Sequence, residues 1–463
     1  MNKQAILSLS ALLVVSAASS FTIRRSLNSP RSTTTVAIES SPAIPAEIAV
    51  WIDEFERLPL TSAFAQSIRA AVQSVRAAPH SSDSWIRLGD VLTARSRAML
   101  DISLYKKTER IYLQAYQLDR TNAHSLAGLA WAAGAAHRFD DSVAWATLAI
   151  RADPEIPAAY AILGDSAVEL GRYDEAARHY QKMLDLQPDM GAYSRAAHLM
   201  YLEGNVPRAM SLIRKALDAA GGDPDQSAWC VAELGMMQCR EGAAPLAVRL
   251  VDEWLKRAPE NPTLLAASGQ AHMAANQDEA AIASIKHAIS IVPQHATLAA
   301  LHDLYLASGR IQDADHVAVQ IEELHRQFQQ EQIQGGEGQL ARFYADRGVK
   351  PDEAVSLAEK EYSHHSGAVA ADTLAWAYFR AGRTTDAQKL LPEILRRRVT
   401  DPAMLYHTGL IEEALGHVMD ARRHLYAALS REPRFNPVHS PIAQAALQRL
   451  SSVVDIAALV ERP

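Results

Sequence analysis

Small, apolar and turn-forming residues alternate along the chain in a pattern that predicts paired antiparallel helices. In residues 157–189, Gly164 falls where two crossing helices need the smallest side chain, and Gly171 falls at the turn between them. Glycine takes the left-handed backbone conformation of such a turn without steric cost. Ala176 supplies a small contact at the start of the second helix, and Pro188 ends that helix because proline cannot continue it. The segment is therefore expected to fold as helix, turn and helix.

The same pattern recurs, with a drift of a few residues, in about ten units across residues 82–435. Recurrence at one period indicates stacked supersecondary units, each of which contacts only its neighbours. Two departures are an insertion of about seven residues around Arg97–Ser103 and a Gln- and Gly-rich stretch at residues 326–339. Glycine markers of the recurrence are Gly89, Gly128, Gly204, Gly235, Gly269, Gly309, Gly382 and Gly409.

This spacing of aromatic, Leu-Gly, Gly, Ala, aromatic and Pro residues resembles the tetratricopeptide repeat consensus over some three quarters of the chain. The whole is similar to bacterial secreted tetratricopeptide proteins. The resemblance implies an all-α, right-handed superhelical solenoid of about ten helix-turn-helix repeats with a C-terminal capping helix. A length of 463 residues, too great for one compact core, agrees with growth by repetition.

We predict seven segments from these patterns. They are a signal peptide or membrane anchor at 1–20, a flexible linker at 21–45, a helical lead-in at 46–81, an N-terminal array at 82–332, a Gly-rich joint at 333–339, a C-terminal array at 340–435, and a capping helix with a tail at 436–463.

The first twenty residues have the parts of a secretory signal: a short basic start, an apolar run from Ala5 to Ala18, and small residues after it. They favour an exported protein, periplasmic or extracellular. However, Arg24, Arg25 and Arg31 follow the apolar run, and the positive-inside rule then allows the opposite orientation. A membrane tether through residues 5–23, or a cytoplasmic product, therefore stays open as an alternative.

By the resemblance, the first helix of each repeat forms the concave wall of the superhelix. One inward position is small in six successive units, and larger apolar or polar residues stand beside it. Such a wall would admit an apolar helix or an extended peptide; alternatively, the same residues pack against the neighbouring repeat. The candidate partner-binding residues are Asp165, His198, Tyr201, Ala232, Met236, Ala266, Met273, Trp376, Phe379 and Tyr406. Asp90 and Asp165, where related chaperone-binding repeats place Asn, would repel a terminal carboxylate.

No catalytic, cofactor or metal motif is present in the sequence, so we predict neither catalysis nor a cofactor nor a metal site. His364 and His365 are the densest histidine pair, but adjacent helical residues face different ways, and we interpret them as solvated loop histidines. Cys230 and Cys239 are nine residues apart on one predicted helix, too far to form a disulfide, and are interpreted as buried small hydrophobes. A net charge of −7 lacks the basic surface of a nucleic-acid binder.

These features predict a non-catalytic scaffold that binds a protein or peptide segment on the concave face of the solenoid. Two alternatives stay open: a structural or assembly subunit of a larger envelope or enzyme complex, and a cytoplasmic regulatory adaptor. The identity of the partner is not encoded in any motif.

Overall fold

The computed structural model describes residues 44–58, 63–330, 336–396 and 401–460, and within them every regular element is a helix. Two helices precede the repeats: α2 (Ala46–Glu56) and α3 (Ala63–Ala77). Then follow α4 (Ser82–Met99), α5 (Leu104–Leu118), α6 (Ala123–Ala135), α7 (Phe139–Ala152), α8 (Pro157–Glu169), α9 (Tyr173–Leu186), α10 (Met190–Leu202) and α11 (Val206–Ala219). The middle of the chain holds α12 (Pro224–Arg240), α13 (Ala244–Leu255), α14 (Pro262–Ala274), α15 (Asp278–Ile291), α16 (His295–Ala307) and α17 (Ile311–Gln330). The last part holds α18 (Glu337–Arg347), α19 (Pro351–His364), α20 (Ala368–Arg380), α21 (Thr384–Leu395), α22 (Pro402–Ala414), α23 (Val418–Arg431) and α24 (His439–Val460).

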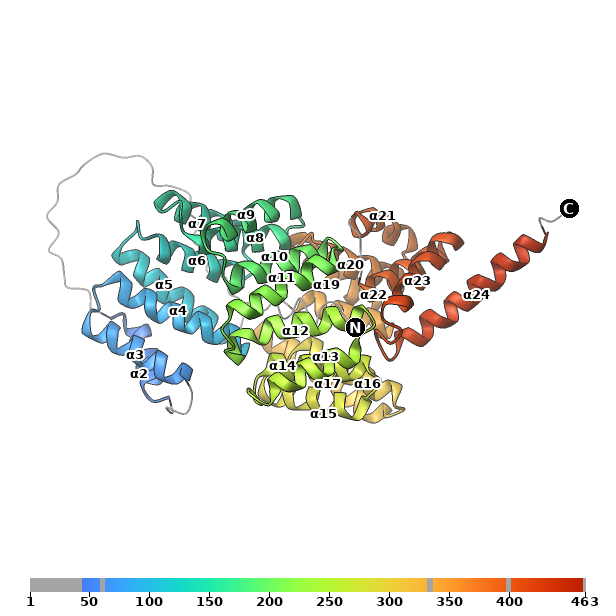
Figure 1. Cartoon of the computed structure of the whole chain (residues 1–463), viewed down its shortest axis with the longest axis horizontal. Helices are drawn as coiled ribbons and strands as arrows, with labels where there is room; N and C mark the ends of the chain where they lie inside the picture. The colour runs from blue at the N-terminus through green and yellow to red at the C-terminus, as the bar shows by residue number, and fades with distance from the viewer. Residues whose placement is uncertain (1–43, 59–62, 331–335, 397–400, 461–463) are drawn as a thin grey trace.

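Consecutive helices pack as antiparallel pairs, from α4 with α5 to α22 with α23, and each pair stacks on the next. Figure 1 shows this stack winding through an elongated molecule, with α24 projecting beyond the last pair. The predicted all-α solenoid of helix-turn-helix units is confirmed. The first part of the insertion around Arg97–Ser103 continues α4 to Met99, and the rest forms the turn that leads into α5 at Leu104.

Gly164 and Gly171 have the roles that the sequence pattern assigns to them. Gly171 has φ +70°, so it turns the chain between α8 and α9 in the left-handed region. A Cβ on Gly164 would stand 2.2 Å from Cε1 of Tyr180 on α9, so only glycine lets that ring lie flat against α8.

We expect Gly164→Val to destabilise the fold, because the branched side chain would force the Tyr180 ring and α9 away from α8. Overpacking of this kind costs about 1–3 kcal/mol. Chemical denaturation followed by circular dichroism measures the effect. Ala158→Val, at an exposed position of the same helix, is the matched control and should change little. Equal stability of the two variants would contradict the packing described for this repeat.

The main core is one apolar cluster that extends from Ala197 on α10 to Leu450 on α24. It contains side chains from before and after residues 331–335, so apolar packing is continuous across the stretch where we predicted a joint. At the C-terminal end, Ala443 and Ala446 of α24 are buried in this cluster together with Phe435. α24 packs on α23 and lies within the segment 436–463, where a capping helix with a tail was predicted.

Several turns bring distant parts of the chain together, so that the solenoid closes on itself. α4 contacts α12 and α14, which follow it by more than a hundred residues. The turn after α19 meets the turn between α8 and α9, where Ser366 Oγ donates to Leu170 O at 3.2 Å. Arg434, after α23, donates to Met273 O at 2.6 Å and pairs with Asp278 at 2.7 Å.

The predicted signal or anchor at 1–20, the tether at 5–23 and nearly all of the linker at 21–45 lie outside the described residues. The same holds for the first part of the predicted joint at 333–339 and for the last residues of the tail. Among the helices that are described, none combines the length and the apolar content needed to cross a membrane.

Candidate functional site

Most of the residues predicted to line the concave wall are buried within the chain. Asp165 and Phe379 are half-buried, and His198 is 8% exposed. The other seven are between 0% and 6% exposed: Tyr201, Ala232, Met236, Ala266, Met273, Trp376 and Tyr406. The chain itself therefore covers these side chains, and their role in partner binding stays a prediction.

The C-terminal helices contact the predicted concave wall, and one of them forms a buried ion pair with it. Arg240, at the end of α12, forms an ion pair of 2.8 Å with Asp401, which caps α22, and both side chains are at most 1% exposed. The Arg240 guanidinium also lies over the ring of Tyr201, 5.3 Å from its centroid. The Arg240–Asp401 ion pair thus links α12, which carries part of the predicted wall, to α22. In this way a later part of the same chain covers the small and apolar residues of the wall.

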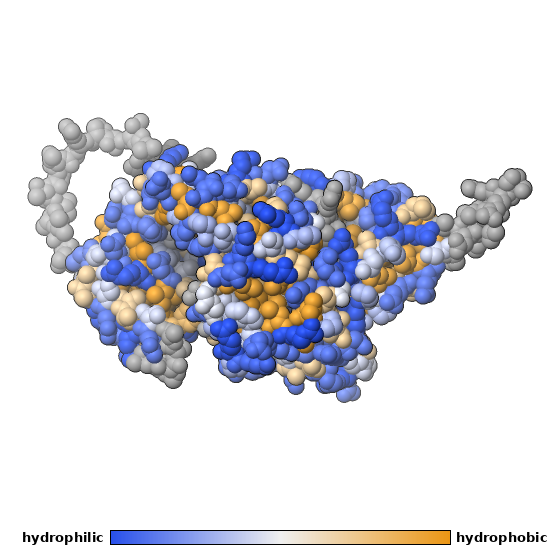
Figure 2. All heavy atoms as spheres, in the orientation of Figure 1, coloured by the Kyte–Doolittle hydropathy of each residue, from blue (hydrophilic) through white to orange (hydrophobic). Residues whose placement is uncertain are grey.

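Large apolar side chains on the outside are scattered rather than gathered on the first helices of the repeats. Figure 2 shows mostly hydrophilic surface on the face that it draws, with apolar areas between. Among the side chains that the structure describes, six of the eight exposed large hydrophobic residues lie on second helices of the pairs, namely Leu148, Leu246, Ile311, Val319, Met419 and Tyr426.

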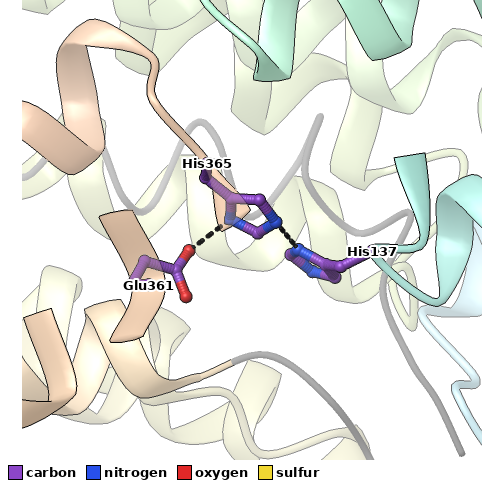
Figure 3. Close-up of side chains that lie close together, drawn as sticks. All are labelled: His137, Glu361 and His365. Atoms are coloured by element: carbon purple, nitrogen blue, oxygen red, sulfur yellow. Dashed lines mark hydrogen bonds and ion pairs between the residues drawn. The ribbon is translucent and has the colours of Figure 1, made fainter. Parts of the chain in front are cut away.

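A histidine cluster joins the turn after α6 to the end of α19. His137, in the turn between α6 and α7, stacks on His365, which ends α19, with ring centroids 4.1 Å apart. Figure 3 shows Glu361 and His137 on opposite sides of the His365 ring, and a nitrogen of that ring lies 2.6 Å from Glu361 Oε1. We name this group the junction cluster: His137, Glu361 and His365.

The environment moves the pKa values of the junction cluster in opposite directions. Burial, reinforced by His365, holds the pKa of His137 well below its usual value. Burial alone would lower the pKa of His365 as well, but the Glu361 carboxylate raises it above the usual value. His137 is thus held neutral, while His365 is the member that more readily takes a proton.

The interpretation of His364 and His365 as solvated loop histidines is wrong for His365, which is 6% exposed. Glu361 precedes His365 by one helical turn and shares its helix face. The spacing was therefore available in the sequence. The approach of His137 was not, because it depends on the closure of the solenoid.

Charged side chains from three helices converge on the inner face of the N-terminal repeats. Asp165 on α8 accepts hydrogen bonds from Arg195 Nε on α10 and from the Tyr180 hydroxyl, each at 2.8 Å. Arg97, near the end of α4, is exposed, but surrounding protein lowers its pKa to about 10, with Arg195 adding to the effect and Asp165 opposing it. Arg97, Asp165 and Arg195 therefore lie close enough for their charges to influence one another.

Aromatic and charged side chains form a second buried group in the C-terminal repeats. Trp376 stacks on His407 with centroids 4.3 Å apart, and its indole N–H donates to Asp346 Oδ1 at 2.8 Å. Asp372 pairs with Arg342 and lies 3.1 Å from Nδ1 of His407. Burial would raise the pKa of Asp372, but Arg342 and His407 lower it to about 2.

Two groups among the described residues carry three side chains suited to a metal ion: the junction cluster, and Asp346 with His407 and His439. In the junction cluster, His137 Nδ1 and His365 Nε2 are already in contact, which leaves no room for an ion between them. Asp346, His407 and His439 come from three separate elements, so no sequence spacing could have indicated that group. Cys230 and Cys239 are buried free thiols, as predicted.

Comparisons in sequence support repeats of the tetratricopeptide kind in both parts of the solenoid. A family model described as "Tetratricopeptide repeat" matches residues 127–191, 163–224 and 373–437. These matches fall between α6 and the start of α12, and between α20 and the residues that follow α23. No curated protein matches the chain in sequence.

Solved structures that resemble the chain are remote in sequence. A chain of the APC/C hetero-tetramer Cut9-Hcn1 is 16% identical, with 87% of this chain covered and a TM-score of 0.43. This chain spans 62% of the length of that one. PilW, a widely conserved type IV pilus biogenesis factor, is 18% identical over 43% of this chain and 92% of its own, with a TM-score of 0.38. Pseudomonas aeruginosa pilF is 14% identical over 46% of this chain and 98% of its own, with a TM-score of 0.37.

Proposed function

We propose that the chain is a non-catalytic scaffold that binds a segment of a partner protein on the inner face of its superhelix. Repeats of this kind build extended surfaces by stacking and need no catalytic group. The small and apolar part of the wall, around Ala232 and Ala266, is covered by the chain itself. Binding is therefore assigned to the N-terminal end of the inner face, where charged side chains touch solvent.

The proposal rests on the position of Arg97, an exposed cation that has no ion-pair partner among the described residues. Its guanidinium lies 5.5 Å from the centroid of the Trp131 ring, and no described carboxylate forms an ion pair with it. An exposed cation without an ion-pair partner among the described residues favours an acidic group supplied from outside.

The charged residues near Arg97 limit the chemical character of the partner segment. Asp165 and Arg195 neutralise each other across α8 and α10, so the wall beyond Arg97 is polar but balanced. Glu169, at the end of α8, has its pKa raised by burial. The partner segment is therefore expected to be polar, with one acidic side chain that meets Arg97.

Site-specific cross-linking tests the location of binding. A photoreactive amino acid at position 97 should form a covalent adduct with a discrete protein in cells that produce the chain. The same residue at position 106 is the matched control, because Lys106 is exposed on the second helix of the same repeat. Adducts from both positions alike, or from neither, would contradict binding on the inner face.

The charge requirement is tested on the captured partner. Arg97→Gln should weaken its affinity about tenfold or more, because a hydrogen bond to a charged group contributes about 1.5–3 kcal/mol. Lys106→Gln removes the same charge outside the inner face and should leave the affinity unchanged. The dissociation constants of both variants can be measured by calorimetry. Equal affinities of the two variants would remove Arg97 from the site.

A further inference from the structure

Three metal-ligating side chains meet between the last repeats and the capping helix without touching one another. Asp346 belongs to α18, His407 to α22, and His439 is the first residue of α24. The Nε2 atoms of His407 and His439 lie 3.9 Å and 4.0 Å from the same atom, Asp346 Oδ1. Both separations are too long for a hydrogen bond. The three groups therefore converge on a gap that no direct bond between them closes.

The size of this gap is that of a coordinated transition metal. Zinc binds imidazole nitrogen and carboxylate oxygen at about 2.0–2.2 Å, so two of its ligand atoms stand about 3.4 Å apart in a tetrahedron and at most about 4.2 Å apart. The observed 3.9 Å and 4.0 Å lie inside this range. All three ligand atoms lie within 4.8 Å of one another.

Surrounding residues hold the ligands in orientations suited to coordination. Asp372 lies 3.1 Å from Nδ1 of His407, and a carboxylate at that nitrogen favours the tautomer whose Nε2 lone pair faces Asp346. Trp376 stacks on the same imidazole and also bonds Asp346. Tyr406 stacks on His439 at 5.1 Å, with the two ring planes 21° apart.

The local charge is compatible with a dication. Arg342 Nη1 lies against His407, 2.9 Å from its Nδ1 and 3.1 Å from its Nε2, but the guanidinium is paired with Asp372. Arg380 donates to the backbone carbonyl of Asp346 at 3.4 Å and lies over the Trp376 ring. Asp303, which accepts a hydrogen bond from Asn436 just before α24, adds a further negative charge. Three carboxylates thus stand against two guanidiniums before any ion is added.

From this geometry we propose that Asp346, His407 and His439 bind one Zn²⁺ ion, which ties the start of α24 to α18 and α22. Two imidazoles and one carboxylate suit zinc and its neighbours among the transition metals rather than Mg²⁺ or Ca²⁺, which prefer oxygen ligands. The ion fastens the capping helix at its first residue, so it stabilises the C-terminal end of the solenoid. This site is independent of Arg97 and of partner binding.

The test is zinc binding to the full chain after treatment with a chelator. Calorimetry with ZnCl₂ should show one equivalent bound, and the melting temperature should rise because the ion binds only the folded chain. CoCl₂ in place of zinc should give visible absorption from nitrogen and oxygen coordination, whereas MgCl₂ should not bind. Absence of zinc binding to the unaltered chain would overturn the proposal without recourse to any variant.

Variants locate the ion. Removal of a residue that only hydrogen-bonds a metal ligand weakens metal affinity about 10–100-fold. Replacement of a ligand itself, in His439→Ala or Asp346→Asn, should therefore weaken the affinity by more than about 100-fold. His316→Ala and Asp352→Asn change the same residue types at exposed positions and should bind like the parent. If His439→Ala lost helical signal in circular dichroism, His439→Gln would replace it. Zinc that is retained by these variants but lost in His365→Ala would place the ion at the junction cluster and overturn the proposal.

Discussion

Asp401→Ala is expected to lower the free energy of unfolding by about 3–5 kcal/mol, the usual cost of removing one partner of a buried ion pair. The Arg240 guanidinium, 1% exposed, would then be left as an uncompensated charge between α12 and α22. The variant also loses a helix cap, because Asp401 Oδ1 accepts a hydrogen bond from Met404 N at 3.0 Å. Such caps typically contribute about 1 kcal/mol.

Denaturation of the full chain, followed by circular dichroism, measures this loss. Asp401→Asn separates its two causes, because asparagine can keep the cap but removes the charge. Glu253→Ala is the matched control, since Glu253 pairs with Lys256 in full contact with solvent and should contribute little. If Asp401→Ala were as stable as the control, Arg240 and Asp401 would not hold the two parts of the solenoid together.

Acidification should destabilise the protein, in part through His295. This side chain, the first residue of α16, is 3% exposed and packs against His325 and Phe328 of α17. Burial, with a smaller effect of His325, lowers its pKa from 6.5 to about 3. Because the folded pKa is the lower one, the unfolded chain takes up the proton first. The stabilisation is complete above pH 6.5 and is lost as the pH falls towards 3.

Each pH unit in this window is worth about 1.4 kcal/mol for one such group. Between pH 6.5 and pH 4.5 we therefore expect His295 alone to remove roughly 2 kcal/mol of stability. His137, whose pKa is also lowered by burial, acts in the same direction. His365 has a raised pKa, so its contribution has the opposite sign: it is present below pH 6.5 and is lost as the pH rises through the folded pKa.

Unfolding free energies at pH 7 and pH 4.5 test this expectation. His295→Phe removes the titrating group in an aromatic environment and should reduce the difference in unfolding free energy between the two pH values by roughly 2.5 kcal/mol. His287→Phe, on the neighbouring α15 with 42% of its side chain exposed, should leave the difference unchanged. An unchanged difference in His295→Phe would show that His295 is not held neutral in the folded chain.

Local residue patterns were sufficient to predict the repeated unit. Gly164, Gly171 and the alanines of the second helices act between a helix and its immediate partner, so their spacing along the chain carries the information. The all-α class and the stacked helix pairs follow from these contacts because a solenoid is built from neighbours. The burial of Cys230 and Cys239 follows in the same way, from the apolar face of one helix.

Tertiary structure determined which residues of the inner face are covered by the chain and which are exposed. Ala232, Met236 and Met273 have the pattern of an open wall, but closure of the solenoid covers them and brings Asp401 to Arg240 from 161 residues away. His137 meets His365, and Asp346 meets His407 and His439, only through the way in which distant repeats are placed relative to one another. Small rotations between successive repeats add up along the stack, and no local spacing records their sum. The sequence by itself therefore determined the unit and its stacking, whereas the superhelical path determined which charged groups meet and which part of the wall touches solvent.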